Sequence, residues 1–212
     1  MKILILGASG GVGQHLVRLA ALQGHAITTL TRAAIELPAN ARGVVDDVLR
    51  DGCLDDHVAG HDVVLSSLGF KRRSPANPWS KLTSPPGFNS ITARALVAAM
   101  KKRGVPRVIA VSAAGVGESA ARMNAVMKFF VSTSNVGVAY RDLAVMEQVY
   151  ADSGLDWCCP RPMRLTNGPQ TDRVRVIDGF PMSAAISRVD VAAYMLDLVS
   201  GPIVDRLPMI AG

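Results

Sequence analysis

A short apolar run that passes directly into three spaced glycines is the feature that most constrains this chain. Residues 2–6 read Lys-Ile-Leu-Ile-Leu, and Gly7, Gly10 and Gly13 follow before an apolar pattern of helical spacing that stops at Gly24. In a strand, turn and helix of this kind, the glycines allow a tight turn, close approach of a pyrophosphate, and close packing of the helix on the strand. Amides and the dipole at the helix start attract phosphate. Because strand and helix both fit, we favour a dinucleotide site over a bare turn, with these residues: Gly7, Ser9, Gly10, Gly11, Val12 and Gly13.

Strands and helices alternate along the rest of the chain. This alternation predicts an α/β fold of Rossmann type, with a doubly wound parallel sheet of about six to eight strands and helices on both faces. The strands expected after the first are 26–30, 43–45, 62–67, 107–112, 155–160 and 207–210. The expected later helices are 53–59, 89–103 and 137–153, and Ser187 with Asp190 forms a capping box that begins a last helix.

Length and composition predict one domain. The chain has 212 residues, 49% of them hydrophobic and 5% aromatic, which suits strands buried on both faces. Segments near 70–88, 115–135 and 160–185 are expected to form the substrate pocket. The Ala/Met/Phe-rich segment 115–135 is interpreted as a core or surface helix, with a mobile lid as the alternative.

Several classes of partner and location are disfavoured by the sequence. A membrane helix needs about 18 apolar residues in a row, and the apolar run after Lys2 is too short for a signal peptide. Three cysteines, Cys53, Cys158 and Cys159, have no metal-ligand spacing and indicate reduced thiols in the cytoplasm, with no metal site. The formal charge of +6 is dispersed, so no nucleic-acid partner is expected.

The ends of the predicted strands supply further candidates, because ligands of such sheets bind at the carboxyl ends of the strands. Arg32 ends the second strand, where an arginine suits a 2′-phosphate and an acid suits a free 2′-hydroxyl, so NADP is expected rather than NAD. Asp47 and Val48 are placed near the adenine. Residues at the end of the fourth strand, Ser67, Leu68 and Gly69, are expected to let the cofactor cross the sheet, and Ser112 is expected beside the nicotinamide.

Several of these segments resemble one known family. The resemblance rests on the glycine turn, Arg32, Val45–Val48, Asp62–Leu65 and Val111–Gly115, and most specifically on Glu147, Ser153–Trp157 and Arg161–Pro169. These segments are similar to the atypical short-chain dehydrogenase/reductases, and within them to the NAD(P)H-binding group that includes flavin reductase/biliverdin reductase B and bacterial NADH-flavin or quinone reductases. The resemblance spans almost the whole chain. It implies that Pro160, Arg161 and Pro162 border the nicotinamide and the substrate.

One departure from the family pattern bears on chemistry. Standard relatives have a lysine four residues after the tyrosine, and its ammonium lowers the tyrosine pKa, whereas this chain has Tyr140 followed by Ala144. A phenol without that lysine keeps a pKa of about 10 and is a poor acid at neutral pH. Flavins and quinones require less, since they accept a hydride and take a proton from solvent. The sequence therefore predicts an NADPH-dependent reductase of a flavin, quinone or related small molecule, with Ser112 hydrogen-bonding near the reacting atoms and Tyr140 lining the pocket.

Two other functions remain open from the sequence. A dinucleotide-sensing regulator would keep the fold, lose the chemistry and report to a protein partner, and the absent lysine favours it. A sugar-nucleotide epimerase or dehydratase shares the glycine pattern. That class needs the tyrosine-lysine pair and a larger C-terminal substrate region than the residues after Gly168 provide.

Overall fold

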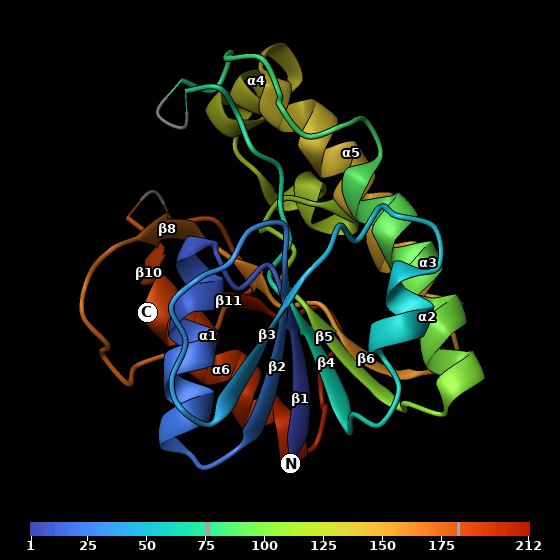
Figure 1. Cartoon of the computed structure of the whole chain (residues 1–212). Helices are drawn as coiled ribbons and strands as arrows, with labels where there is room; N and C mark the ends of the chain where they lie inside the picture. Colours follow the sequence, from blue (N-terminus) through green and yellow to red (C-terminus); the bar gives the residue numbers. More distant parts are fainter. Residues whose placement is uncertain (75–76, 182) are drawn as a thin grey trace.

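The computed structural model describes residues 1–74, 77–181 and 183–212, and its centre is a six-stranded parallel sheet (Figure 1). The strand order is β3-β2-β1-β4-β5-β6. Because the chain builds outward from β1 in one direction and then returns to add β4 on its other side, the carboxyl ends of β1 and β4 form a crevice. The strands are β1 Lys2–Leu6, β2 Ala26–Thr31, β3 Ala41–Val45, β4 Val63–Ser66, β5 Arg107–Ala110 and β6 Asp156–Cys158.

Helices cover both faces of this sheet, as the sequence predicts. One face carries α1 (Gly11–Leu22) and α6 (Arg188–Ser200), and the other carries α2 (Cys53–His57), α3 (Phe88–Arg103) and α5 (Asn135–Ala151) (Figure 1). Side chains alternate along β1, so Ile3 and Ile5 join the core under α1 and α6, while Leu4 and Leu6 join the core under α3 and α5. The predicted doubly wound α/β fold is confirmed.

Smaller elements lie beyond the carboxyl end of the sheet. A 3₁₀ helix, η1 (Gly117–Arg122), precedes α4 (Ala125–Thr133), which Figure 1 shows at the top of the molecule. The C-terminal third adds two small sheets. In one, β10 (Ala185–Ser187) pairs with β8 (Arg164–Thr166); in the other, β11 (Met209–Ala211) lies between β7 (Arg161–Pro162) and β9 (Arg175–Val176).

The main strands and helices end within two residues of the predicted bounds. The structure differs from the prediction in the segment 115–135 and in the last strand. The segment 115–135 forms two helices, because Met123 between them is buried in the core, whereas α4 has no buried residue along its described length. The last strand, β11, joins a small separate sheet. Pro75, Ala76 and Met182, which fall in two of the predicted pocket segments, lie outside the described residues.

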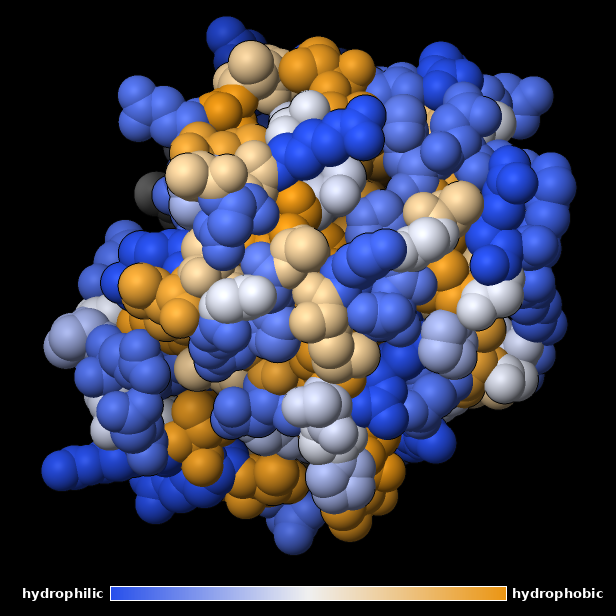
Figure 2. Space-filling model, turned by 60° about the horizontal axis from the view of Figure 1, so that its bottom comes forward, coloured by the Kyte–Doolittle hydropathy of each residue, from blue (hydrophilic) through white to orange (hydrophobic). Residues whose placement is uncertain are grey.

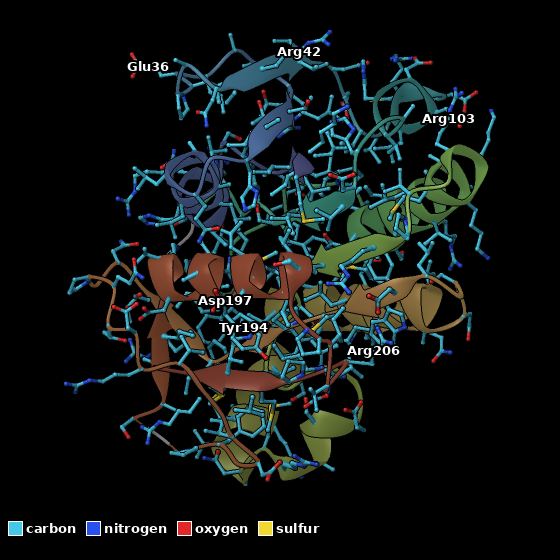
Figure 3. All side chains as sticks on the ribbon, turned by 90° about the horizontal axis from the view of Figure 1, so that it is seen from below. Glu36, Arg42, Arg103, Tyr194, Asp197 and Arg206 are labelled. Atoms are coloured by element: carbon cyan, nitrogen blue, oxygen red, sulfur yellow. The ribbon has the colours of Figure 1, made fainter. Side chains whose placement is uncertain are left out.

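The surface carries mixed polarity. Figure 2 shows hydrophilic residues over most of the face at the amino ends of the strands, with hydrophobic residues in separate small areas. Figure 3 shows Arg42 at the edge formed by β3, while Arg206 lies far from it, where its guanidinium donates to Asp156 of the opposite edge strand at 2.6 Å. Within the described ranges, no helix has both the length and the apolar character needed to cross a bilayer.

Candidate functional site

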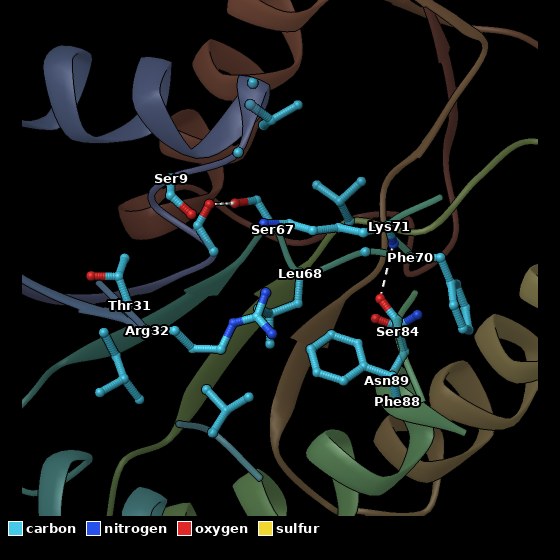
Figure 4. Close-up of a pocket in the computed structure, with 18 of the residues that line it drawn as sticks. Ser9, Thr31, Arg32, Ser67, Leu68, Phe70, Lys71, Ser84, Phe88 and Asn89 are labelled. Carbon is cyan, nitrogen blue, oxygen red and sulfur yellow. Dashed lines mark hydrogen bonds between the residues drawn. The ribbon is translucent and has the colours of Figure 1, made fainter. Parts of the chain in front are cut away.

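A cleft of about 400 Å³ opens at the carboxyl ends of the strands (Figure 4). Loops that follow β1 to β5 line it, together with the first turns of α1, α3 and α6. The predicted cofactor residues that line it are Gly7, Ser9, Gly10, Gly11, Val12, Arg32, Asp47, Val48, Ser67, Leu68, Gly69 and Ser112. Among the described lining residues, five come from the predicted pocket segment 70–88 and Leu165 comes from the segment 160–185, whereas none comes from the segment 115–135, whose part in the pocket stays a prediction.

The glycine turn has the geometry that its sequence predicts. Gly7 has a φ of +80°, and a Cβ added there would lie 2.8 Å from the carbonyl carbon of Ser67. The Ser67 hydroxyl donates to the Gly7 carbonyl at 3.2 Å and so ties the turn to β4. Gly13 lies behind the turn and is not part of the cleft lining. A Cβ at this position would come within 2.1 Å of the Gly7 oxygen, so only glycine lets the helix pack this closely on the turn. Its function is close packing of the helix.

The start of α1 presents bare backbone to the cleft. Gly10 is the N-cap without any side-chain cap, and the first bond of the helical ladder runs from the Gln14 amide to the Gly10 oxygen at 2.9 Å. The amides of residues 11–13 therefore precede that ladder and point outward, and no acidic side chain lies in this turn. This is the geometry of a phosphate site at a helix N-terminus.

Arg188, which the sequence does not point to, lies beside this turn. A Cβ added to Gly11 would come within 2.6 Å of the Arg188 Cδ, and the Arg188 guanidinium donates to Asn167 at 2.6 Å. The Ser187 hydroxyl caps α6 by accepting from the Asp190 amide at 3.1 Å, as the capping box predicts, and this places Arg188 at the first helical position. Its approach to the glycine turn depends on the packing of α6 against α1.

The adenosine end of the cleft carries an exposed arginine. Figure 4 shows the Arg32 side chain reaching into the cleft toward Leu68. The Asp46 carboxylate, at the end of β3, is held by Arg50 at 2.6 Å and by His57 at 3.1 Å, and the hydrogen bond from Arg50 holds the pKa of Asp46 well below its usual range. Asp46 is thus engaged by its neighbours, whereas the exposed Arg32 and Asp47 side chains both line this end of the cleft.

Asp46, Cys53 and His57 bring three potential metal ligands within 4.8 Å of one another. The Arg50 guanidinium donates to the Asp46 carboxylate at 2.6 Å, and burial raises the pKa of the Cys53 thiol. These contacts hold the loop before α2.

Ser112 ends the cleft, and a buried charge network lies behind it. Its hydroxyl donates to Glu147 of α5 at 2.6 Å. Arg161 donates to the same carboxylate at 2.9 and 2.7 Å and also to Glu118 of η1, and it is only 1% exposed. Because the Ser112 hydrogen is directed at Glu147, its oxygen is left to accept a hydrogen bond from the cleft.

The cofactor contacts expected at Pro160, Arg161 and Pro162 stay a prediction. Their side chains are not among the residues that line the cleft. The Pro160 and Pro162 carbonyls instead accept from the amides of Ser112 and Ala114, at 2.9 and 3.1 Å. The segment supports the strand end from behind, because its backbone is used for pairing and its arginine for the buried network.

Tyr140 also lies outside the lining of the cleft. It is partly buried and packs against the core on the α5 side, and a Cβ added to Gly115 would come within 3.1 Å of its ring. Burial raises its pKa above the ordinary value of a phenol, against a small opposing effect of Arg72. With Ala144 in place of a lysine, nothing in its described surroundings lowers that pKa enough for proton transfer at neutral pH.

The end of the cleft opposite Arg32 is lined in part by the predicted pocket segment 70–88. Phe70, Ser84 and Phe88 of that segment come together with Asn89 in Figure 4, and Leu143 of α5 closes the wall. Asn89 and Leu143 were not predicted, because a polar and an apolar residue within long helices carry no local signal for a pocket. The cleft thus joins a phosphate-binding turn and a cation at one end to an aromatic, mostly apolar end.

The uncapped glycine turn, the exposed Arg32 side chain and the length of the cleft fit a dinucleotide. The comparison with known families agrees, since the model of the NAD(P)H-binding family matches residues 7–202. The chain belongs to this NAD(P)H-binding family. The resemblance to atypical short-chain dehydrogenase/reductases is thereby confirmed.

Solved structures share the fold of this chain. ChuY, an anaerobilin reductase from Escherichia coli, superposes with a TM-score of 0.79 at 20% identity, over 100% of this chain and 97% of that one. The oxidoreductase ylbE from Lactococcus lactis gives 0.78 at 21% identity, covering 100% and 91%. A short-chain dehydrogenase/reductase from Veillonella parvula in complex with NADP gives 0.78 at 18% identity, covering 100% and 94%. At these identities the likeness establishes the fold.

Proposed function

We propose that this protein is an NADPH-dependent reductase that transfers a hydride to a small conjugated acceptor such as a flavin or a quinone. The observation that carries the proposal is the continuity of the cleft, which runs from the glycine turn and Arg32 to Ser112 and the aromatic end. Such a cleft can hold a dinucleotide extended across the sheet with an acceptor beside its nicotinamide.

Each residue of the cleft has a physical task in this proposal. The amides of residues 11–13 and Arg188 bind the pyrophosphate, and Arg32 pairs with the 2′-phosphate. The Ser112 oxygen accepts a hydrogen bond from the nicotinamide carboxamide, because its own hydrogen is used on Glu147. Phe70 and Phe88 offer flat apolar surface to an aromatic acceptor.

The chemistry asks for positioning rather than acid catalysis. A bound reduced nicotinamide supplies the hydride. The acceptor gains that hydride and then a proton from solvent, so no protein acid is required, which agrees with the raised pKa of the partly buried Tyr140. Close placement of the two rings and exclusion of water account for the rate.

The test separates cofactor choice from turnover. Dissociation constants for NADPH and NADH are measured by fluorescence titration for the native protein and for Arg32→Ala, with Arg42→Ala as a matched surface control on β3. Loss of a charge-assisted contact predicts that Arg32→Ala weakens NADPH about tenfold or more and leaves NADH unchanged. Oxidation of NADPH is then followed with FMN and with a naphthoquinone.

A dinucleotide sensor is the second candidate, favoured by Ala144 in the lysine position. Tight NADPH binding without oxidation by any acceptor would support the sensor, with a protein as its partner. NADPH oxidation with either acceptor would support the reductase. Equal binding of NADPH and NADH would refute the function given to Arg32.

The compartment is part of the same proposal. Cys53, Cys158 and Cys159 are buried free thiols, and burial raises the pKa of Cys158 to about 12. Thiols of this kind are suited to a reducing compartment, and we place the protein in the cytoplasm with a small molecule as its electron acceptor.

A further inference from the structure

The side-chain amide of Asn89 is a buried polar group in the lining of the cleft. Asn89 is 3% exposed, and both its Nδ2 and its Oδ1 lack a partner among the described residues. A buried polar atom left unpaired costs about 1–3 kcal/mol, and most such atoms in folded proteins are paired. Asn89 also lines the cleft. In this position the Asn89 Nδ2 can donate a hydrogen bond to a ligand in the cleft, and its Oδ1 can accept one.

The backbone around Asn89 holds the side chain in place. Asp142 of α5 accepts from the Asn89 amide at 2.8 Å and from the Ser90 amide at 3.2 Å, and so caps α3 from another helix. The N-cap residue Gly87 has no side chain to do this. Because Asp142 fixes the start of α3, the backbone of Asn89 is held beside the cleft.

The surroundings of Asn89 indicate which part of a ligand it meets. It lies at the end of the cleft that carries Phe70 and Phe88, with Leu143 nearby in the lining, and away from Ser9 and Arg32 (Figure 4). It also lies on the face of the sheet opposite α1, which binds the phosphates in our proposal. A flat ring placed between these apolar walls would turn one polar edge toward the amide.

We infer that Asn89 binds the electron acceptor through a neighbouring N–H and C=O, and that the preferred acceptor is therefore a cyclic imide or lactam rather than a quinone. The Asn89 oxygen accepts from the ring N–H, and its NH₂ donates to the adjacent carbonyl. A quinone has carbonyls but no N–H, so it leaves the Asn89 oxygen unpaired. This inference rests on the proposed function, because it concerns the acceptor of that reaction.

The experiment uses two isoalloxazines that differ in one atom group. Lumiflavin has a free ring N3–H, and 3-methyllumiflavin carries a methyl group there. Binding of each to the protein saturated with NADP⁺ is measured by flavin fluorescence, and oxidation of NADPH by each is measured in parallel. We expect lumiflavin to bind about tenfold or more tightly than its methylated analogue, because the latter leaves the Asn89 oxygen buried and unpaired.

Two variants assign that preference to one side chain. Asn89→Leu should bind the two flavins within about twofold of each other, and its melting temperature should be equal to or above that of the native protein, because two unpaired buried atoms are removed. Thr92→Val is the matched control on the same helix. Its hydroxyl is paired with the Phe88 carbonyl at 2.8 Å, so this variant should lose stability and keep the preference for lumiflavin.

The outcomes separate this inference from the proposed function. Equal binding of both flavins to the native protein, binding of neither, or a preference that survives in Asn89→Leu would overturn the inference. A loss of NADP⁺ affinity in Asn89→Leu with the flavin preference intact would also overturn it and assign the amide to the cofactor. Preferential lumiflavin binding without NADPH oxidation would support Asn89 and refute the reductase.

Discussion

Removal of the Arg161 guanidinium is expected to destabilise the fold strongly. Arg161 is 1% exposed, and its main partner Glu147 is 5% exposed. In Arg161→Met the Glu147 carboxylate stays buried with the Ser112 hydroxyl as its remaining partner. The loss of one member of a buried ion pair costs about 3–5 kcal/mol. The contact to Glu118 adds little, since that side chain is 66% exposed, and exposed pairs contribute less than about 1 kcal/mol.

Urea unfolding followed by circular dichroism measures this cost. Arg122→Met is the matched control, because the Arg122 side chain is 51% exposed and pairs with a fully exposed Asp178, so we expect a loss below about 1 kcal/mol. The double variant Arg161→Met, Glu147→Leu should be more stable than Arg161→Met alone, since both charges leave together. A loss of unfolding free energy below about 1 kcal/mol in Arg161→Met would refute the reasoning. A double variant no more stable than Arg161→Met would refute it as well.

Three further perturbations test other parts of the structure. Gly7→Ala should destabilise more than Gly24→Ala, because both have positive φ, which costs about 1–2 kcal/mol, but a Cβ on Gly24 meets nothing within 4 Å; equal losses in urea would show that the contact with Ser67 relaxes. Asp142→Ala should cost about 1–2 kcal/mol of unfolding free energy through loss of the α3 cap, and an unchanged urea midpoint would contradict this. Burial alone would raise the pKa of Asp156, but Arg206 and Arg107 lower it by more, so the pKa in the folded protein lies below the pKa in the unfolded chain. The carboxylate therefore stabilises the fold above the unfolded-state pKa, and this stabilisation is lost as pH falls through the folded-state pKa. Asp156→Asn should flatten the acid limb of urea midpoints plotted against pH.

The sheet and the glycine turn could be predicted because their signals are local. An apolar run, a glycine spacing and a helical pattern each lie within a few residues, and parallel strands bring their carboxyl ends to one edge. This places Arg32, Ser67 and Ser112 at the cleft without any knowledge of long-range contacts. The sequence also indicates that Tyr140 lacks a lysine.

Side-chain direction and helix-to-helix contacts could not be predicted in the same way. The motif around Arg161 places it near Ser112, but the paired backbone of β7 directs the guanidinium to Glu147, behind the cleft. Asn89 and Arg188 each begin a helix, and their place in the cleft depends on how α3 packs on α5 and α6 on α1. Such packing has no signature in the spacing of residues along one element.

Helix α5 positions three parts of the acceptor end of the cleft. Asp142 fixes the start of α3, Leu143 lies in the wall, and Glu147 orients Ser112. One residue inserted between Leu143 and Glu147 would rotate the following part of the helix by roughly 100° about its axis. Glu147 would then no longer be aligned with Asp142 and Leu143. The segment that precedes α3 is tied to the same helix, because the Asn135 amide at the start of α5 donates to the Pro78 carbonyl at 3.1 Å and its side-chain amide donates to the Trp79 carbonyl at 2.9 Å. The walls of the acceptor pocket on both sides of the cleft therefore take their alignment from α5.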